Sequence, residues 1–262
     1  MTIYPLWDAE IPGRATEIPS LVHYAPENKR SRAAVVIFPG GGYAHRAPHE
    51  GHGYAEFLAE FGVTAFVVNY RVAPATFPDE LLDARRAVRF VRANAERFGI
   101  DTAQVLVMGS SAGGHLAALV STYREAIDGE GADAIDEQSP FPNAQVLCYP
   151  VISSDPSVGH SGCYQKLLGE RLGEAAAYDP ELLVTPETPA AFIWHTAADN
   201  GVNVTNSYRY AAALRAANVP CEVHVFPFGP HGQGLAAHLP HVAQWTKLFQ
   251  NWLILSGYRD AE

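Results

Sequence analysis

Short apolar runs rich in β-branched and aromatic residues recur along the chain, and runs of this kind predict buried strands. They occupy residues 33–38, 63–70, 103–108, 144–149, 191–196 and 221–226. Between them, apolar residues recur at helical spacing, in stretches that occupy residues 50–61, 78–98, 111–122, 204–217 and 240–255. Because strand and helix alternate, the pattern predicts an α/β fold, a mostly parallel central sheet with helices on both faces.

The predicted helix at 78–98 mixes apolar side chains with several arginines, and Gly99 follows it where a helix-ending glycine belongs. This pattern predicts one face against the sheet and one face in water. Asp83, Arg85 and Arg86 allow two interpretations, a buried ion pair or a solvated face, and the solvated face is the commoner arrangement.

No internal repeat, low-complexity tract or linker rich in Pro, Gly or Ser divides the chain. We therefore expect a single domain over residues 1–262. Two stretches fit no strand or helix: residues 123–143, which are acidic and contain glycine, and residues 153–189, with scattered Pro, Gly and Ser. Because long irregular inserts in compact folds often carry function, we expect both inserts near the mouth of a site.

Composition and charge narrow the functional classes. The chain has 262 residues, of which 48% are hydrophobic, and this is enough for a sizeable core, so general disorder is excluded. Its 18 Lys and Arg against 28 Asp and Glu give a formal net charge of −10, which argues against non-specific binding of nucleic acid or anionic membranes. A small neutral or cationic partner fits this charge better.

No apolar run approaches the roughly 18–20 residues of a membrane span, and residues 1–10 lack the basic-then-apolar order of a secretory signal, so we expect a cytoplasmic protein. The three cysteines, Cys148, Cys163 and Cys221, are widely spaced and odd in number. They predict neither a disulfide framework nor a CxxC pair, and we expect reduced residues that serve packing.

The strongest chemical signal is the sequence GSSAG at residues 109–113, which follows the predicted strand 103–108 and opens the predicted helix 111–122. A G-x-S-x-G motif between strand and helix is typical of a nucleophile elbow. Its glycines permit a strained turn, and the helix N-terminus supplies N–H groups and a partial positive charge. The setting predicts Ser111 as an exposed nucleophile, whereas Ser110 has no flanking glycines at the required spacing. The alternative is a glycine-rich turn that only packs helix on sheet.

A serine nucleophile needs a base, and the base needs an orienting acid. His231 lies in a glycine-rich loop after the last predicted strand, and Asp199 follows the strand before it. Both positions lie past strand C-termini, where open parallel sheets place their sites, and the order Ser, Asp, His is that of an α/β-hydrolase. The alternatives are an N-cap role for Asp199 ahead of 204–217 and a solvent-exposed loop histidine. Asp155, past the strand 144–149, is a rival acid.

Three consecutive glycines, at residues 40–42, follow the first strong strand. Backbone N–H groups that no side chain obstructs suit the oxyanion of a tetrahedral intermediate. We therefore expect the N–H groups of Gly41 or Gly42, together with that of Ala112, to form an oxyanion hole. The alternative is a loop that uses glycine only because it needs positive φ.

Other histidines carry weaker signals. His45, His49 and His52 would gather on one side of a helix with Glu50 close by, as a metal site requires. Pro48 interrupts this stretch, however, so we favour surface or rim histidines over a metal site.

His115 follows the predicted nucleophile by one helical turn, and we expect a packed histidine beneath the elbow rather than a second base. Trp194 lies in the middle of a predicted strand, so we expect it in the core.

Taken in order, these motifs and their neighbours form a recognisable series. The segments that carry it are residues 6–7, 11–13, 38–43, 49–51, 69–71, 83–87, 109–117, 149–153, 167–169, 195–199, 206–207 and 231–235. Over nearly the whole chain, the series resembles the esterase branch of the α/β-hydrolase superfamily that includes acetylxylan esterases and related carbohydrate deacetylases. The resemblance implies the roles inferred above: Ser111 as nucleophile, Asp199 as acid and His231 as base. It also implies that Gly41, Gly42 and Ala112 supply the oxyanion donors. Two positions depart from the family pattern: Asn203 replaces a frequent proline, and Pro230, which fixes φ before His231, replaces a glycine.

These inferences predict a two-step ester hydrolysis through an acyl-enzyme, with no metal or organic cofactor needed. We expect short acyl groups, acetyl first, because the inserts are short for a deep lipase lid, and the resemblance implies acetylated sugars or xylo-oligosaccharides. Alternatives are an amidase such as an aryl-formamidase, a small-peptide peptidase on the same triad, or a binding protein on a retired hydrolase scaffold. The sequence does not name the alcohol half of the substrate, and it leaves a homo-oligomer open.

Overall fold

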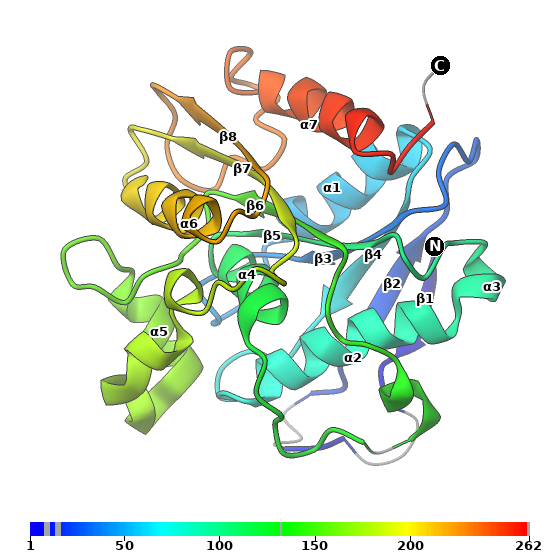
Figure 1. Cartoon of the computed structure of the whole chain (residues 1–262), viewed down its shortest axis with the longest axis horizontal. Helices are drawn as coiled ribbons and strands as arrows, with labels where there is room; N and C mark the ends of the chain where they lie inside the picture. Colours follow the sequence, from blue (N-terminus) through cyan, green and yellow to red (C-terminus); the bar gives the residue numbers. More distant parts are fainter. Residues whose placement is uncertain (8–10, 14–16, 132, 261–262) are drawn as a thin grey trace.

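The structure of the chain is a computed structural model, and it describes residues 1–7, 11–13, 17–131 and 133–260 (Figure 1). The expected domain of residues 1–262, the segment 1–10 and the expected insert at 123–143 therefore each include positions that lie outside the described residues.

Within the described residues, the strands form one eight-stranded sheet in the order β1-β2-β4-β3-β5-β6-β7-β8. The strands are β1 Thr2–Pro5, β2 Ser20–Tyr24, β3 Ala34–Phe38, β4 Thr64–Asn69, β5 Val105–Ser110, β6 Ala144–Cys148, β7 Ala190–Thr196 and β8 Cys221–Phe226. β2 pairs antiparallel with both β1 and β4, whereas every other neighbouring pair is parallel. The predicted fold class is confirmed.

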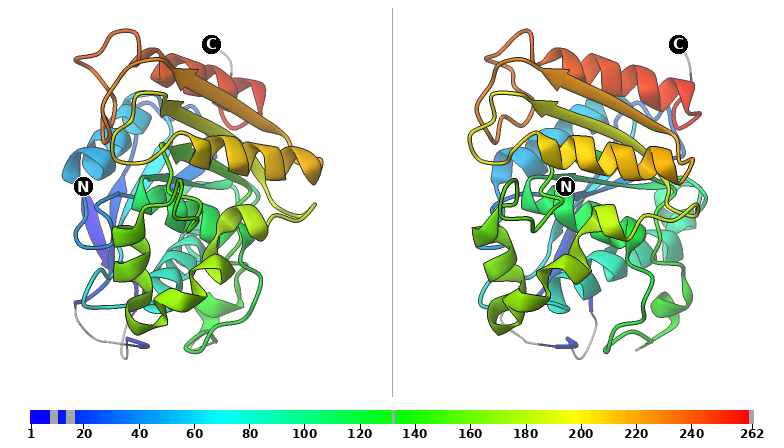
Figure 2. Two further views of the ribbon diagram at one scale, coloured as in Figure 1. Left: turned by 90° about the vertical axis from the view of Figure 1, so that its left-hand side faces the viewer. Right: turned by 60° about the vertical axis from the view of Figure 1, so that its left-hand side comes forward.

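Helices cover both faces of the sheet, as Figures 1 and 2 show. The α-helices are α1 Pro48–Glu60, α2 Asp79–Ala93, α3 Ala95–Phe98, α4 Ala112–Thr122, α5 Ser161–Leu168, α6 Thr205–Ala216 and α7 Gln244–Leu255. The 3₁₀ segments are η1 Ala134–Glu137, η2 Gly169–Tyr178 and η3 Pro180–Leu182. α1 and α7 pack on one face, and α2, α4 and α6 pack on the other.

Two strands, one predicted helix and the two stretches expected to fit no strand or helix differ from the predictions. Residues 153–189 contain α5, η2 and η3, and residues 123–143 contain η1. β1 and β2 were missed because they are short, β1 is mostly exposed and β2 is only partly buried, so they lack the continuous apolar run of the central strands. The predicted helix at 78–98 is divided at Asn94, which ends α2 and precedes the single turn of α3.

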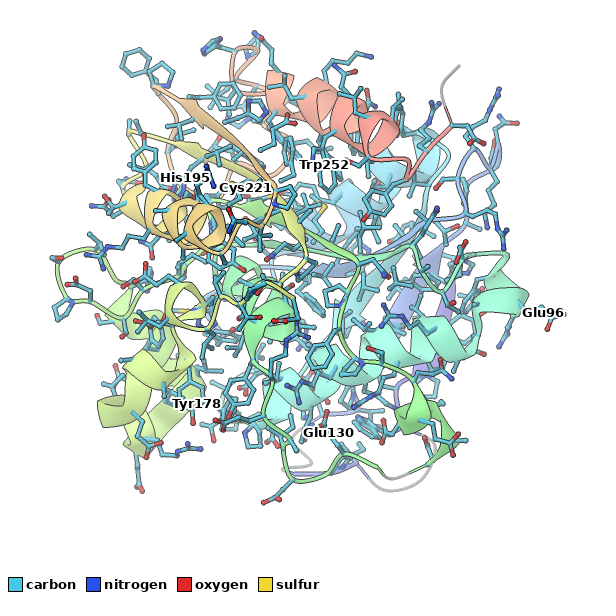
Figure 3. All side chains as sticks on the ribbon, viewed as in Figure 1. Glu96, Glu130, Tyr178, His195, Cys221 and Trp252 are labelled. Carbon is cyan, nitrogen blue, oxygen red and sulfur yellow. The ribbon has the colours of Figure 1, made fainter. Side chains whose placement is uncertain are left out.

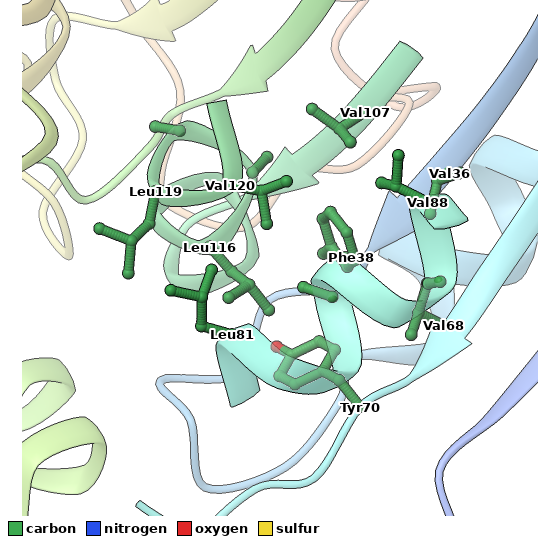
Figure 4. Packing of buried hydrophobic residues seen from close by; sticks show 14 of the residues in the cluster. Val36, Phe38, Val68, Tyr70, Leu81, Val88, Val107, Leu116, Leu119 and Val120 are labelled. Carbon is green, nitrogen blue, oxygen red and sulfur yellow. The ribbon is translucent and has the colours of Figure 1, made fainter. Parts of the chain in front are cut away.

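The face of the sheet toward α2 and α4 carries a continuous apolar core, seen from close by in Figure 4. Among its fully buried members are Val36 and Phe38 of β3, Val107 of β5, Val88 of α2 and Leu116 of α4. Burial of each such side chain contributes on the order of 1.5–3 kcal/mol. This packing fixes the strand ends and therefore the loops that follow them.

The expectation of a solvated face on the helix at 78–98 is wrong, because every residue from Asp79 to Arg92 is buried. Its arginines hold the described residues of the segment 123–143 against the helix: Arg85 contacts Glu130 at 3.1 Å and Arg86 contacts Asp136 at 3.0 Å. Figure 3 shows Glu130 beside this helix. Long arginine stems can line a packed surface while their guanidinium groups reach paired partners.

Asp83 does form a buried ion pair, but its partner is Arg71 rather than Arg85 or Arg86. Arg71 donates to both carboxylate oxygens, from Nε at 2.9 Å and from Nη2 at 2.8 Å. This bidentate contact ties the end of β4 to α2. Hydropathy alone could not identify it because Arg71 lies outside the predicted helix.

In the described part of the chain, no helix has both the length and the apolar character that a bilayer crossing requires.

Candidate active site

Ser111 lies at a sharp turn between the end of β5 and the first residue of α4. Its backbone is strained, with φ 53° and ψ −118°. Glycine is required on both sides because a Cβ at Gly109 would lie 2.0 Å from Gly113 O, and a Cβ at Gly113 would lie 2.0 Å from Phe38 O. The turn presents the hydroxyl beyond the C-terminal edge of the sheet.

The structure brings Ser111, His231 and Asp199 together. His231 Nε2 lies 2.9 Å from Ser111 Oγ, and His231 Nδ1 lies 2.8 Å from Asp199 Oδ2. The Asp199 side chain is 1% exposed and the His231 side chain 25% exposed. His231 is therefore not a solvent-exposed loop histidine, and Pro230 does not move its ring away from the serine.

Asp199 is held by donors on both carboxylate oxygens. Oδ1 accepts the N–H groups of Gly201 and Val202, each at 2.8 Å, and Oδ2 lies 3.3 Å from His195 Nε2. Burial acts to raise the pKa of Asp199, but the hydrogen bonds from His195, His231 and Val202 hold it below its usual range. The group therefore stays ionised at neutral pH. It is not the N-cap of α6, a position that Val204 occupies.

The ionised Asp199 also determines which nitrogen of His231 carries the proton. A carboxylate only accepts hydrogen bonds, so His231 Nδ1 donates to it. Nε2 then has a free lone pair directed at the Ser111 hydroxyl, as a general base requires.

Asp155, the rival acid, lies elsewhere. Its Oδ2 pairs with Arg209 at 2.7 Å, and its Oδ1 accepts the Ser157 N–H at 2.9 Å. Hydrogen bonds from Ser157 and Arg209 lower the pKa of Asp155 to about 2. The carboxylate that contacts His231 is that of Asp199.

A cavity of about 280 Å³ opens beside Ser111. Its walls come from the glycine loop, from α1, from the histidine loop and from the segment after β6: Gly41, Gly42, His45, Ala47, His49, Glu50, Ser111, Val151, His160, Cys163, His231 and Gly232. Of the two inserts expected near the site, the one at 153–189 contributes His160 and Cys163. The described residues of the other, 123–143, lie against α2 instead, because its acidic residues and carbonyls pair with the arginines of that helix.

Gly41 and Gly42 line this cavity with φ of 130° and 63°. Within the described residues, neither of their N–H groups donates to an acceptor. Ala112 begins α4, so its N–H has no partner inside the helix. The loop therefore has the positive φ that the alternative interpretation required, and it also leaves backbone donors beside the serine.

His45, His49 and His52 do not converge on a common point. His49 Nε2 donates to Gly232 O at 2.9 Å, and the His52 ring contacts the Tyr24 hydroxyl. Pro48 begins α1 rather than interrupting a helix, because proline is tolerated in a first turn. Across the described ranges, no group of three or more His, Cys, Asp or Glu side chains is arranged to hold a metal ion.

His115 is packed beneath the elbow, as predicted. Its Nε2 donates to Tyr178 O at 2.9 Å, and its Nδ1 accepts from the Tyr43 hydroxyl at 2.8 Å. Burial lowers the pKa of His115 to about 4. Trp194 is also in the core, as predicted, stacked on Trp245 with ring centroids 4.8 Å apart.

We expect the stability of the folded protein to fall less at low pH in His115→Gln than in the parent. The folded-state pKa of about 4 lies below the unpaired value of 6.5, so the unfolded chain binds the proton more readily. The contribution of neutral His115 to the free energy of unfolding is complete above pH 6.5. As the pH falls toward 4, this free energy decreases by about 3 kcal/mol. Glutamine can keep both hydrogen bonds without titrating. Thermal midpoints of the two proteins, measured across this range, should therefore fall less in the variant, and equal falls would contradict the assignment.

Two residues of the cavity region were missed as contributors to the site. Glu50 and Tyr149 are buried and hydrogen-bonded to each other at 2.7 Å. In the sequence, both lie in the segments 49–51 and 149–153 that carry the family resemblance, and Glu50 also lies beside the histidines considered for a metal site.

The sequence is similar to one protein family and to several known proteins. The BD-FAE family model matches residues 21–214. Endo-1,4-beta-xylanase B of Butyrivibrio fibrisolvens is 34% identical over 225 residues, which are 84% of this chain and 35% of that protein. An acetylxylan esterase of Xylanibacter ruminicola is 33% identical over 247 residues, 89% of this chain and 47% of that protein. The chain thus spans less than half the length of these two curated relatives.

Solved structures match this chain over nearly its whole length. An acetyl ester-xyloside bifunctional hydrolase from Caldicellulosiruptor lactoaceticus is 40% identical with a TM-score of 0.92, covering 98% of this chain and 97% of that one. A thermophilic esterase from Thermogutta terrifontis, with propionate bound, is 25% identical with a TM-score of 0.81, covering 100% of this chain and 96% of that one.

Proposed function

The chain belongs to the BD-FAE family, a family of α/β hydrolases, as the sequence resemblance predicted, and we propose that it is a serine esterase with Ser111 as nucleophile. Its class, carboxylic ester hydrolase, follows from the esterases among its relatives and structural neighbours. The proposal makes His231 the base and Asp199 the orienting acid. The observation that carries it is the pair of hydrogen bonds, 2.9 Å and 2.8 Å long, that links the three side chains.

In the proposed reaction, His231 Nε2 takes the Ser111 proton as Oγ attacks the ester carbonyl carbon. The tetrahedral intermediate places its negative oxygen toward the N–H groups of Gly41, Gly42 and Ala112, and each such donor is typically worth about 2.7–4 kcal/mol to the barrier. His231 then protonates the departing alcohol, which leaves an acyl-enzyme on Ser111. Water then gives a proton to His231 Nε2 as its oxygen attacks the acyl carbon, and His231 returns that proton to Ser111 Oγ as the bond between Oγ and the acyl carbon breaks and the acid is released.

Asp199 acts on this cycle through the imidazole. When His231 holds two protons, it is a cation next to a buried carboxylate that is ionised beforehand. The charge pair stabilises the protonated ring in both transition states, and the Nδ1 contact keeps the ring facing Ser111.

The size of the cavity supports short acyl groups. Its volume of about 280 Å³ lies just below the range of roughly 300–1,000 Å³ for sites that enclose a drug-sized ligand. We propose acetyl esters of sugars or xylo-oligosaccharides as substrates. We also propose that the chain forms a single domain. The acetylxylan esterase among the relatives and the polar rim of His45, His49 and His160 both support a hydroxyl-rich alcohol half.

We expect p-nitrophenyl acetate to exceed p-nitrophenyl octanoate in kcat/KM by at least about tenfold, because an octanoyl chain and the aryl group must share a cavity of about 280 Å³ that the acetyl ester fills less completely. Rates should be measured on monomeric substrate and corrected for background with the Ser111→Ala protein. Acetate release from acetylated xylo-oligosaccharides tests the alcohol half directly. Equal turnover of the octanoate would contradict the short-acyl assignment, and faster turnover of a matched formyl amide would favour an amidase.

A further inference from the structure

One buried carboxylate in the cavity wall takes no part in the reaction as derived above. Glu50 lies in the first turn of α1 and is 3% exposed. Its two oxygens have different partners: Oε2 accepts the Gly40 N–H at 2.9 Å, and Oε1 accepts the Tyr149 hydroxyl at 2.7 Å. Gly40 belongs to the loop after β3, and Tyr149 to the segment after β6. The single carboxylate therefore joins two loops that border the cavity.

Tyr149 extends this connection to a third loop. Its hydroxyl donates to Glu50 and accepts the Gly234 N–H at 2.9 Å. Gly234 belongs to the loop that carries His231, and its carbonyl accepts from Trp245 Nε1 at 3.2 Å. The Tyr149 ring also packs edge-on against the His231 ring, with centroids 5.2 Å apart. A displacement of Tyr149 would therefore shift His231 in two ways, through the contact between their rings and through the hydrogen bond to the backbone of Gly234.

The residues around Glu50 allow these close approaches. A Cβ at Gly40 would lie 2.4 Å from Glu50 Oε2, so only glycine lets the backbone come this near. On the neighbouring position of α1, His49 donates to Gly232 O at 2.9 Å and so adds a direct contact between the helix and the histidine loop, besides the indirect one through Tyr149. Buried carboxylates are unfavourable unless donors surround them, and hydrogen bonds to a charged oxygen are shorter and stronger than neutral ones. Glu50 is therefore suited to fix the distance between its partners.

We propose that Glu50 is a positioning residue: through Gly40 on one oxygen and Tyr149 on the other, it sets the oxyanion loop and the His231 loop relative to each other. The inference rests on the serine mechanism proposed above. The loop on one side carries Gly41 and Gly42, and the loop on the other carries the base. Since a displacement of about 1 Å at a catalytic group can lower a rate about 100-fold, the connection matters for turnover more than for substrate affinity.

Two variants interrupt the connection at different atoms. Glu50→Gln keeps the size of the side chain but places an NH₂ group opposite one of its two donors. Tyr149→Phe removes only the hydroxyl. Each should lower kcat for p-nitrophenyl acetate about 10- to 100-fold while KM changes less than about threefold. Because both act on one hydrogen-bonded chain, the double variant should lose little more than the worse single variant.

Tyr210→Phe is the matched control. Tyr210 is also fully buried, and its hydroxyl donates to Gln145 Oε1 at 2.9 Å, but Gln145 lies at the opposite end of β6 from Tyr149. Its kcat should stay within about twofold of the parent. Circular dichroism and thermal midpoints identify any variant that is unfolded. If Glu50→Gln fails to fold, Tyr149→Phe tests the proposal alone.

Labelling by a fluorophosphonate separates this inference from the function on which it rests. In both variants, Ser111 should still be labelled to completion, but more slowly than in the parent. Parental kcat in folded Glu50→Gln and Tyr149→Phe, or a rise in KM at unchanged kcat, would overturn the positioning role. Failure of the parent to label at Ser111 would instead overturn the proposed esterase mechanism.

Discussion

Replacement of Ser111 by alanine should lower kcat for p-nitrophenyl acetate by at least about 10⁴-fold. The substitution removes the only oxygen placed 2.9 Å from His231 Nε2 within the described residues, and with it the covalent acyl-enzyme. The remaining rate would come from the backbone donors and from binding of the ester next to the base. The fold should be little affected, because the Ser111 side chain does not cap α4. Steady-state kinetics, single-turnover acylation and a thermal midpoint test each part of this expectation.

The matched control is Ser121→Ala, which removes a buried serine from the same helix. Ser121 Oγ donates only to Ala117 O at 2.8 Å, one turn earlier in α4. Its loss should leave kcat within about twofold of the parent. Mass spectrometry of protein treated with a fluorophosphonate should place the label on Ser111 and on no other serine. Undiminished hydrolysis by folded Ser111→Ala protein would remove the basis for a serine mechanism.

The central strands were predictable because burial on both faces leaves a distinctive sequence. β3 to β7 are covered on both sides by helices, so they appear mainly as apolar runs rather than as alternating ones, whereas β8 is an edge strand of intermediate burial. β1 and β2 lie at one edge of the sheet, and β1 is mostly exposed. Four or five half-exposed residues resemble a loop as closely as a strand, so pattern alone could not separate the two.

The error at α2 has a different cause. Its sequence has the charge distribution of a solvated helix, but its arginines find partners far along the chain: Arg85 bonds Glu130, and Arg86 bonds Asp133 and Asp136. A hydropathy pattern describes a helix by itself, and it cannot indicate that a later segment will cover the outer face. Sequence distances of more than 40 residues separate each of these pairs.

The candidate site was more predictable than the elements around it, because the topology of a parallel sheet restricts where such residues can meet. Parallel strands bring their C-terminal ends to one edge, so Ser111 after β5, Asp199 after β7 and His231 after β8 all lie at the same edge of the sheet. The choice of Asp199 over Asp155 was less certain from sequence, since either follows a strand of the same sheet. The role of Glu50 could not be predicted, because its partner Tyr149 lies 99 residues away and neither belongs to a motif with a known mechanism.

Asp199→Asn should lower kcat about 10³- to 10⁴-fold and leave KM close to the parental value. The introduced asparagine would still accept the N–H groups of Gly201 and Val202 through its one amide oxygen, as Asp199 Oδ1 does at 2.8 Å. That places the amide NH₂ against His231 Nδ1, which must then act as an acceptor. The ring proton moves to Nε2, so the nitrogen facing Ser111 can no longer take the serine proton. The variant also loses the negative charge that stabilises the protonated ring.

Asp155→Asn provides the control, because it removes a carboxylate that follows a strand of the same sheet but pairs with Arg209 instead of His231. It should retain kcat within about twofold of the parent. A ¹⁵N spectrum of the imidazole should report Nδ1 protonation in the parent and in Asp155→Asn but Nε2 protonation in Asp199→Asn. The opposite pattern, with activity lost on changing Asp155 and kept on changing Asp199, would mean that the acid operates from the earlier strand. The hydrogen bond of 2.8 Å between His231 and Asp199 would then be structural rather than catalytic.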